Sequence, residues 1–206
     1  MVTPKNLFIA LEGIDGSGKS TQVRLLADKL TALGHKVHVT CEPTTNRIGR
    51  MIRDVFTGRD SADQSVIAAL FAADRLDHIL NEKDGLLTML QDGYTVISDR
   101  YYFSSYAYHS VYVPMDWVIQ LNDYAQKLLQ PDLNIYIDVA PKVAMDRINA
   151  NRSSVEMYET LDNLKAVYDN YHTAFELMKD KEKIVSIDGN QDIQSISLAI
   201  LSKVNF

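Results

Sequence analysis

Residues 7–22 read LFIALEGIDGSGKSTQ, and this stretch decides the fold. Its first five residues are apolar and predict a strand, and the glycine-rich turn that follows opens a helix at about Lys19. Residues 13–20 match the pattern G-x-x-x-x-G-K-[ST], in which glycine lets backbone N–H groups turn towards phosphate oxygens. The helix N-terminus adds partial positive charge, and Lys19 adds an ammonium group. The stretch therefore predicts a loop that binds the phosphates of a nucleoside triphosphate.

The residues of this loop are assigned to ATP as one group. They are Gly13, Ile14, Asp15, Gly16, Ser17, Gly18, Lys19, Ser20 and Thr21. Ser20 is predicted to ligate Mg²⁺ through its hydroxyl, with Asp99 at the end of a later strand as the outer-shell partner. The alternative is a glycine-rich turn that binds no nucleotide. A GTPase is set aside because the chain has no N-K-x-D segment to recognise guanine.

Five short β-prone segments alternate with helical patterns along the chain. The predicted strands are 7–11, 36–41, 94–98, 133–139 and 183–187. The predicted helices are 19–33, 47–56, 65–81, 85–91, 115–129, 142–149, 157–178 and 193–204. This alternation predicts right-handed βαβ units, and hence a three-layer α/β fold with a five-stranded parallel sheet and helices on both faces. Ligands are then expected at the carboxyl ends of the strands.

The length and composition limit the class of protein. The 206 residues fit a single domain spanning 1–206, and the net charge of −6 opposes nucleic-acid binding, which needs clustered Lys and Arg. The apolar runs are far shorter than the roughly 20 residues of a membrane span, and the N-terminus does not resemble a secretory signal. Cys41 is the single cysteine, so no intramolecular disulfide forms. We expect a cytoplasmic protein without a membrane or nucleic-acid partner.

A second set of candidate residues lies after the third predicted strand and on one predicted helix. Asp99 and Arg100 end the run VISDR, and the five N–H donors of a guanidinium suit the bridging of phosphate oxygens. The alternative for Arg100 is a salt bridge at a strand end. Phe71 and Arg75 are four residues apart and share a helix face that could hold a nucleobase, although Phe in such an apolar segment is more often core.

Three dispersed motifs together resemble those of thymidylate kinases, a family of P-loop kinases of nucleoside monophosphates. The motifs are EGIDGSGKSTQ at 12–22, FAADR at 71–75 and DRY at 99–101, with Glu42-Pro43 and Tyr158-Glu159 as further matches. The resemblance covers about residues 7–171. It implies an enzyme that uses Mg²⁺ and ATP to phosphorylate dTMP to dTDP in the biosynthesis of dTTP. It also implies a homodimer, for which the helices predicted at 65–81 and 115–129 offer apolar faces.

The resemblance further implies roles for individual residues around dTMP. Asp15 lies by the 3′-hydroxyl of the acceptor sugar and the transferring phosphate. Phe71 stacks on thymine and Arg75 contacts the base, while Arg100 holds the acceptor phosphate. The remaining contacts to dTMP, two small polar residues and two on the side of the lid, are Ser104, Ser105, Tyr158 and Glu159.

Residues 149–156 are predicted to form a lid, because a kinase must exclude water from the transferring phosphoryl group. The variable positions of the phosphate-binding loop carry no arginine, as in relatives whose lid supplies the cation of the transition state. Arg152 is assigned that role. The predicted catalytic residues are therefore Asp15, Lys19, Arg100 and Arg152. The alternative for Arg147 and Arg152 is a solvated charge at a helix end.

Some residues depart from the family pattern, and other interpretations stay open. Thr44 and Thr45 replace Gly-Gly, His109 stands where Gln is frequent, and Met157 stands where Arg is expected. A deoxynucleoside kinase would need a base, for which Glu42 is placed suitably. The chain could also be an ATP-binding module without transfer chemistry, or could prefer another pyrimidine monophosphate. For dTMP we expect a direct in-line transfer without a covalent enzyme intermediate.

Overall fold

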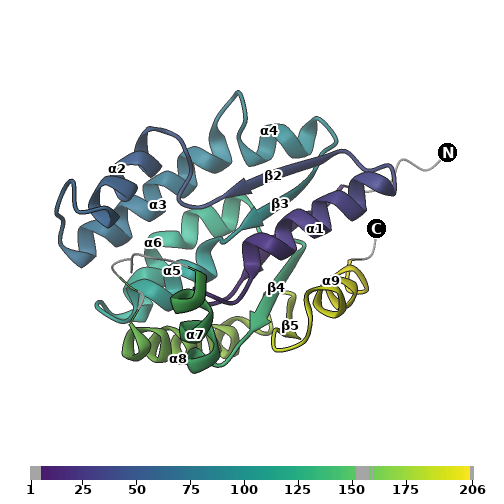
Figure 1. Ribbon diagram of the computed structural model, residues 1–206. Coiled ribbons are helices and arrows are strands. Elements are labelled where there is room, and N and C mark those ends of the chain that lie inside the picture. Colours follow the sequence, from purple (N-terminus) through teal and green to yellow (C-terminus); the bar gives the residue numbers. More distant parts are fainter. Residues whose placement is uncertain (1–5, 152–157, 159, 205–206) are drawn as a thin grey trace.

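The computed structural model describes residues 6–151, 158 and 160–204. At its centre is a five-stranded sheet whose strands all run parallel (Figure 1). The strands are β1 (Phe8–Glu12), β2 (Val37–Cys41), β3 (Thr95–Asp99), β4 (Leu133–Asp138) and β5 (Ile184–Asp188). Their order across the sheet is β2-β3-β1-β4-β5, which places β1 in the middle. The predicted α/β fold with a five-stranded parallel sheet is confirmed.

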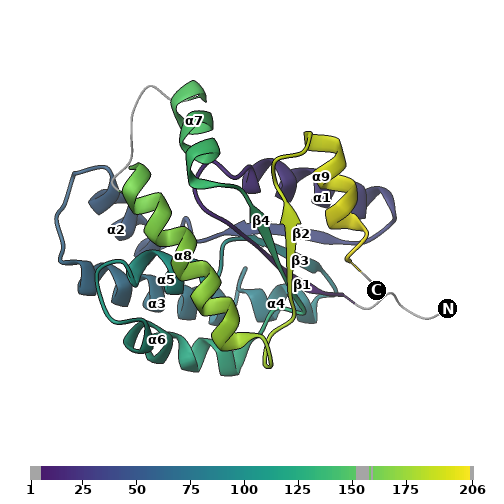
Figure 2. The same ribbon diagram turned by 90° about the horizontal axis from the view of Figure 1, so that it is seen from below.

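Helices connect the strands and cover both faces of the sheet. They are α1 (Lys19–Ala32), α2 (Arg47–Phe56), α3 (Gln64–Leu80), α4 (Leu86–Gln91), α5 (Tyr102–His109), α6 (Met115–Leu128), α7 (Pro141–Asn151), α8 (Leu161–Met178) and α9 (Ile193–Leu201). On one face α1 packs against α9, and on the opposite face α5 packs against α8 (Figure 2). The helices on the face of α5 and α8 also include α3 and α6, which pack against each other and against α5. α2 lies against α3. Within the described residues, no helix is both long and apolar enough to cross a bilayer.

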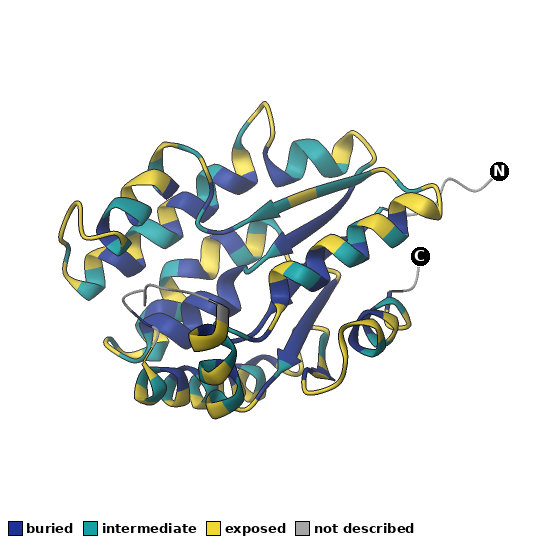
Figure 3. Cartoon of the chain, in the orientation of Figure 1, coloured by how far each residue is buried: buried dark blue, intermediate teal, exposed yellow. Residues whose placement is uncertain are grey.

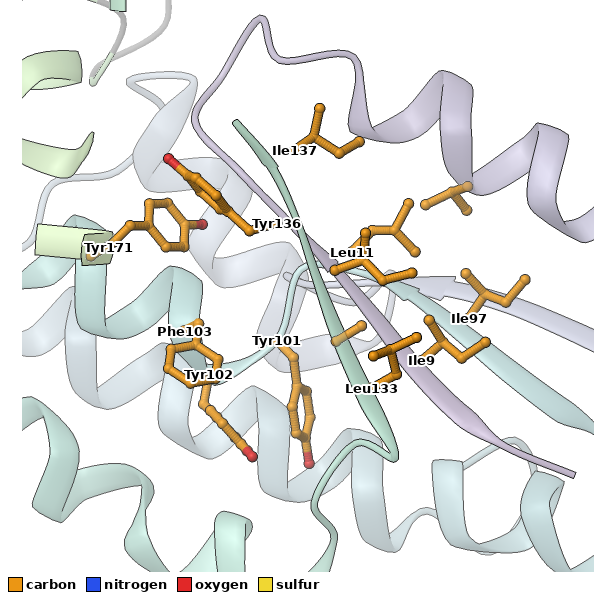
Figure 4. Close-up of a cluster of buried hydrophobic side chains, with 14 of the residues drawn as sticks. Ile9, Leu11, Ile97, Tyr101, Tyr102, Phe103, Leu133, Tyr136, Ile137 and Tyr171 are labelled. Carbon is orange, nitrogen blue, oxygen red and sulfur yellow. The ribbon is translucent and has the colours of Figure 1, made fainter. Parts of the chain in front are cut away.

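The two faces of the sheet carry different kinds of side chain. Because strand side chains alternate in direction, Ile9 and Leu11 of β1 point to the face that α1 covers (Figure 4). On the other face lie the buried rings of Tyr101, Tyr136 and Tyr171, the last of which belongs to α8 (Figure 4). The centroids of the Tyr136 and Tyr171 rings are 5.0 Å apart. The aromatic face therefore brings the hydroxyl of Tyr171 close to the end of β1.

The carboxyl ends of β1 and β3 lie next to each other in the interior of the sheet. In the register of the two strands, Leu11 pairs with Asp99. β2 forms the edge beyond β3 and is less buried than its neighbour (Figure 3). Open parallel sheets bind ligands in the crevice outside the carboxyl ends of their strands. The loop after β1 and the residues after β3 are therefore placed to form one site.

Two helices differ most from the sequence prediction. α5 follows β3 after two residues, and the sequence predicts no helix there. The reason is that the many aromatic residues of α5 are only moderate helix formers. Its first turn is fixed by tertiary contacts instead: the Tyr101 N–H donates to Glu12 Oε1 at 2.9 Å, and the Ser104 hydroxyl donates to Glu12 Oε2 at 2.6 Å. The helix predicted from residue 157 begins only after Thr160, whose hydroxyl accepts a hydrogen bond from the N–H of Asn163 and caps α8.

Candidate functional site

The loop between β1 and α1 forms one wall of a cleft. At Gly16 the loop has φ of 79°, and a Cβ there would lie 2.4 Å from the carbonyl oxygen of Ala144, so the position requires glycine. The cleft has a volume of about 460 Å³. Besides the loop, its lining consists of Cys41, Glu42, Pro43, Arg53, Asp99, Arg100, Arg147 and Ile148. The predicted ATP-binding loop thus faces residues from the ends of β2 and β3.

Lys19 lies in the wall of this cleft with its ammonium turned inward. The residue is 6% exposed, and Nζ donates to the carbonyl oxygen of Ile14 at 3.0 Å. Burial, followed by the charge of Arg100, lowers the pKa of Lys19 to about 8, although Asp15 and Asp99 act in the opposite direction. A phosphate bound in the loop would add negative charge next to this ammonium and raise its pKa again.

Ser20 and Asp99 meet beside the same loop. The Ser20 hydroxyl donates to Asp99 Oδ2 at 2.6 Å. Hydroxyl and carboxylate oxygens are the ligands that Mg²⁺ prefers. No group of three or more His, Cys, Asp or Glu that could hold a metal ion occurs among residues 6–151, 158 and 160–204. The donor set therefore fits an Mg²⁺ ion that takes most of its ligands from water and from phosphate oxygens.

Asp15 and Arg100 form an ion pair between the loop and the residue after β3. Arg100 Nη2 lies 2.5 Å from Asp15 Oδ1. The Tyr108 hydroxyl of α5 donates to Asp15 Oδ2 at 2.9 Å and accepts from the Asp15 N–H at 2.9 Å, while Arg100 Nη2 donates to it at 3.1 Å. Burial alone would raise the pKa of Asp15, but Arg100 and Lys19 outweigh it and lower that pKa. The Asp15 carboxylate is therefore charged at neutral pH.

The backbone of Arg100 adopts a conformation that is rare outside glycine. Its φ is 75°, which costs on the order of 1 to 3 kcal/mol for such a residue. The Arg100 N–H donates to the carbonyl of Leu11 at 2.9 Å, and the Ser98 hydroxyl donates to the Arg100 carbonyl at 2.6 Å. Nη1 donates to the carbonyl of Gly13 at 3.2 Å and to Ser104 Oγ at 3.0 Å. These contacts aim the guanidinium at the phosphate-binding loop, so the salt bridge of Arg100 belongs to the site.

Glu12, the last residue of β1, is a fully buried carboxylate behind this ion pair. It accepts hydrogen bonds from the Ser104 hydroxyl at 2.6 Å and from the Tyr171 hydroxyl at 2.9 Å. Burial raises the pKa of Glu12. Ser104, a predicted contact to dTMP, therefore links Glu12 to Arg100 inside the protein.

Phe71 belongs to an aromatic cluster beside the cleft. Its ring centroid lies 4.8 Å from that of His109 and 5.9 Å from that of Phe56. Burial lowers the pKa of His109 to about 3, so this imidazole is neutral. Tyr158 packs against Phe56 with centroids 5.4 Å apart, and its hydroxyl donates to Gln64 Oε1 at 2.8 Å. The structure thus brings the predicted residues Phe71 and Tyr158 into one cluster, which does not line the 460 Å³ cleft.

Arg75 lies one turn after Phe71 on α3 and is 1% exposed. Its Nε and Nη2 donate to Glu42 Oε2 at 2.9 and 2.6 Å, and Nη1 donates to Ser105 Oγ at 3.1 Å. Since Glu42 also lines the cleft, this pair connects the aromatic cluster to the cleft wall. Ser105, a second predicted contact to dTMP, lies on the Arg75 side of α5.

Two predicted site residues, Arg152 and Glu159, lie outside the described residues, as do residues 152–156 of the predicted lid. Residues 149–151 belong to the end of α7, which extends beyond its predicted boundary at 149. Arg147 of α7 lines the cleft and donates from Nη2 to the carbonyl of Gly189 at 2.9 Å. Arg147 is therefore held by the loop after β5 and is not a purely solvated charge.

Three residues of the site have no role in the sequence prediction. Tyr108 follows Ser104 by four residues on α5, a spacing that reveals a shared face only if the segment is taken as a helix. Arg53 lines the cleft and holds two backbone carbonyls after β2. Tyr171 is 159 residues away from its partner Glu12 in the sequence, so no local pattern connects them.

Comparison with known proteins points to one family. A sequence model of the thymidylate kinase family matches residues 11–200. A probable thymidylate kinase of Staphylothermus marinus is 38% identical over 190 residues, which cover 92% of this chain and 89% of the relative. Another from Pyrococcus horikoshii is 35% identical over 203 residues, covering 96% of each chain. A third, from Pyrobaculum aerophilum, is 42% identical over 165 residues, covering 80% of each.

The lowered pKa of Lys19 predicts that nucleotide binding takes up a proton in mildly alkaline solution. At pH 8.5 a pKa of about 8 leaves much of the ammonium deprotonated, and a bound phosphate raises that pKa. ADP binding should therefore weaken as the pH rises above 8. Titration calorimetry at pH 8.5 in buffers with different ionisation enthalpies should show proton uptake. Lys19→Arg, whose charge is permanent, is the matched control and should bind ADP without uptake; uptake of the same size in both proteins would exclude Lys19 as its source.

Proposed function

Because the chain belongs to the thymidylate kinase family, we propose that it transfers the γ-phosphoryl group of ATP directly to dTMP at the ion pair of Asp15 and Arg100. The chain is a phosphotransferase that converts dTMP to dTDP, a step of nucleotide biosynthesis. The observation that carries the proposed site is the guanidinium of Arg100, which touches both Asp15 and the Gly13 carbonyl of the phosphate-binding loop. A cation in this place is within reach of phosphates held by that loop.

On the ATP side, the residues 13–21 would hold the triphosphate. Lys19 would contact the transferring phosphoryl group, and Ser20 with Asp99 would hold Mg²⁺. When bound, Mg²⁺ neutralises charge on the phosphate oxygens. Ser20 would contribute its hydroxyl oxygen, while Asp99 would accept hydrogen bonds from the ligand shell, consistent with the 2.6 Å contact between the two side chains.

On the acceptor side, Arg100 would orient the phosphate of dTMP for attack. A phosphate monoester has a second pKa of about 6, so the nucleophile is ionised near neutral pH and needs no strong general base. Asp15 would accept a hydrogen bond from the sugar 3′-hydroxyl, because a charged carboxylate has more acceptor positions than Arg100 and Tyr108 occupy. Positioning and electrostatic stabilisation then supply the rate enhancement.

The thymine base would lie at the aromatic cluster. Phe71 would stack on it and Arg75 would donate to it, with Ser105 close by. The pairing of Glu42 argues against the deoxynucleoside kinase alternative. Its Oε2 accepts from Arg75 and its Oε1 lies 3.0 Å from His78 Nδ1, so both carboxylate oxygens are engaged inside the protein. A general base must reach the proton that it removes.

Tyr158 and Glu159 would contact the sugar from the lid side, and Arg152 in the lid at 149–156 would supply a cation to the transition state. Residues 1–206 would act as one domain. A cytoplasmic location rests on the composition and single cysteine of the chain, and cell fractionation would test it.

A homodimer is the proposed assembly. Large apolar side chains on two adjacent helices are exposed: Val66 and Leu80 on α3, by 48% and 51%, and Tyr124 on α6, by 60%. Burial of such a surface stabilises association by about 25 cal/mol per Å² of apolar area before the entropic cost is subtracted. Sedimentation velocity at micromolar concentration should therefore give the mass of two chains. A monomer at every concentration would refute the assembly.

The acceptor prediction is tested by ADP formation with Mg²⁺-ATP and equal concentrations of dTMP, dUMP, UMP, CMP and thymidine. We expect dTMP to give the highest kcat/KM. Faster turnover of thymidine would support the nucleoside kinase alternative, and faster turnover of another monophosphate would reassign the acceptor. ATP binding without turnover of any acceptor would favour a module that lacks transfer chemistry.

Arg100→Ala should lower kcat/KM for dTMP. The expected loss of transition-state stabilisation is about 2 to 4 kcal/mol, as for other lost contacts that stabilise developing charge. ATP affinity should change little, because the guanidinium is assigned to the acceptor phosphate. Steady-state kinetics and ATP titration measure the two effects separately. Arg59→Ala is the control, since Arg59 is exposed and pairs only with the exposed Asp54 among the described contacts. Near-normal turnover by Arg100→Ala would remove Arg100 from the mechanism.

A further inference from the structure

A buried chain of hydrogen bonds runs from the edge strand β2 to Arg75. Thr40 Oγ1 lies 2.7 Å from His78 Nε2, and His78 Nδ1 lies 3.0 Å from Glu42 Oε1. The other oxygen of Glu42 accepts from Nε and Nη2 of Arg75. The side chains of His78, Glu42 and Arg75 are only 4%, 2% and 1% exposed. None of the roles assigned so far uses His78.

The carboxylate of Glu42 determines which nitrogen of His78 must carry a hydrogen. An ionised carboxylate can only accept, so His78 Nδ1 must carry a hydrogen and donate it to Glu42. At the other ring nitrogen, the Thr40 hydroxyl can serve as donor or as acceptor, so each of these polar groups has a partner. With one Glu42 oxygen held by His78, the carboxylate cannot rotate freely. Its second oxygen therefore presents a fixed acceptor to one edge of the Arg75 guanidinium.

Arg75 is held on its other side as well. Nη1 donates to Ser105 Oγ and to Asn122 Oδ1, and the Asn122 amide is oriented by its own bond to the Val118 carbonyl at 2.8 Å. A guanidinium has five N–H groups. One on Nε, two on Nη1 and one on Nη2 are thus used by the residues that the structure describes. A single N–H on Nη2 is left for a ligand, and its direction depends on the Glu42 carboxylate.

We propose that His78 is a positioning residue for the nucleotide acceptor: through Glu42 it sets the direction in which Arg75 offers its remaining N–H to a base carbonyl. This inference rests on the proposed contact between Arg75 and the base. We call this chain of hydrogen bonds from Thr40 to Arg75 the relay. His78 lies three residues after Arg75 on the same face of α3, so one rigid helix carries both partners of Glu42, which itself follows β2. Thr40 completes the relay from the edge of the sheet.

The test is the steady-state kinetics of His78→Leu, with thermal unfolding and circular dichroism to verify the fold. In metal sites, removing a hydrogen-bond partner that orients a ligand lowers metal affinity or activity by about tenfold or more. By analogy, we expect KM for dTMP to rise about tenfold in His78→Leu. The kcat at saturating dTMP and the KM for ATP should stay within about twofold, because the relay does not touch the phosphate-binding loop. His78→Asn, whose amide can still donate to Glu42, should restore most of the dTMP affinity.

Thr40→Val is a second, milder variant that keeps the imidazole and removes its hydroxyl partner. It should raise KM for dTMP by less than His78→Leu does, and it keeps the inference testable if His78→Leu fails to fold. An unchanged KM for dTMP in folded His78→Leu would overturn the proposal. A fall in kcat with equal rises in the KM for dTMP and the KM for ATP, not rescued by His78→Asn, would indicate a purely structural role for His78. That result would also overturn the proposal.

Arg75→Lys separates this inference from the proposed function on which it rests. If His78 acts through Arg75, adding His78→Leu to Arg75→Lys should cause little further rise in KM for dTMP, since the two changes would not be additive. If Arg75→Lys alone leaves KM for dTMP unchanged, the proposed contact between Arg75 and the base is wrong, and so is the positioning role of His78. If Arg75→Lys raises this KM and the His78 variants do not, the base contact stands and the relay alone is wrong.

Discussion

The buried carboxylate of Glu12 is the group around which the site is organised. It ends the central strand β1 at zero exposure, and burial raises its pKa. A buried carboxyl group of this kind is tolerated only when hydrogen bonds satisfy it. The donors come from segments far apart in the chain: the backbone of Tyr101, the hydroxyl of Ser104 on α5 and the hydroxyl of Tyr171 on α8. Satisfying this one carboxylate thus locks two helices onto the end of β1.

The same requirement explains why Arg100 can hold an unfavourable backbone conformation. Arg100 lies between Asp99, which ends β3, and Tyr101, whose N–H is bound to Glu12, so its position is fixed from both sides. Its φ of 75° turns the side chain out of the strand direction and towards Asp15. The cost is offset by the contacts of Ser98 and Leu11 to its backbone. Departures from local preference that the surroundings compensate are typical of functional positions.

The sequence predicts the parts of the site that depend on short-range pattern. The phosphate-binding loop, the parallel sheet and the Ser20–Asp99 contact follow from the glycine spacing and from strands that end at one edge. α5 and the partners of Glu12 could not be predicted. The local pattern of a segment rich in Tyr and Phe predicts a strand or a core segment, and this one becomes helical through contacts across the fold. The partners of Arg75 were missed for the same reason: Glu42 and Asn122 come from other elements, and no spacing links them.

The two halves of the site are held in different ways, and this difference bears on selectivity. On the side of the phosphate-binding loop, Lys19 and Ser20 each make one described contact, to a carbonyl or a carboxylate, that a phosphate oxygen could replace. On the other side, Arg75 already donates four of its five N–H groups to oxygen atoms of the protein. A donor fixed so firmly cannot turn to follow a different partner. Sites with buried, oriented hydrogen-bonding groups reject analogues that leave those groups unpaired far more strongly than apolar pockets reject extra methyl groups. With the base placed against Arg75 and Phe71 as we propose, discrimination should therefore be strict for the carbonyl pattern of the base and weaker for substituents that meet only the ring of Phe71.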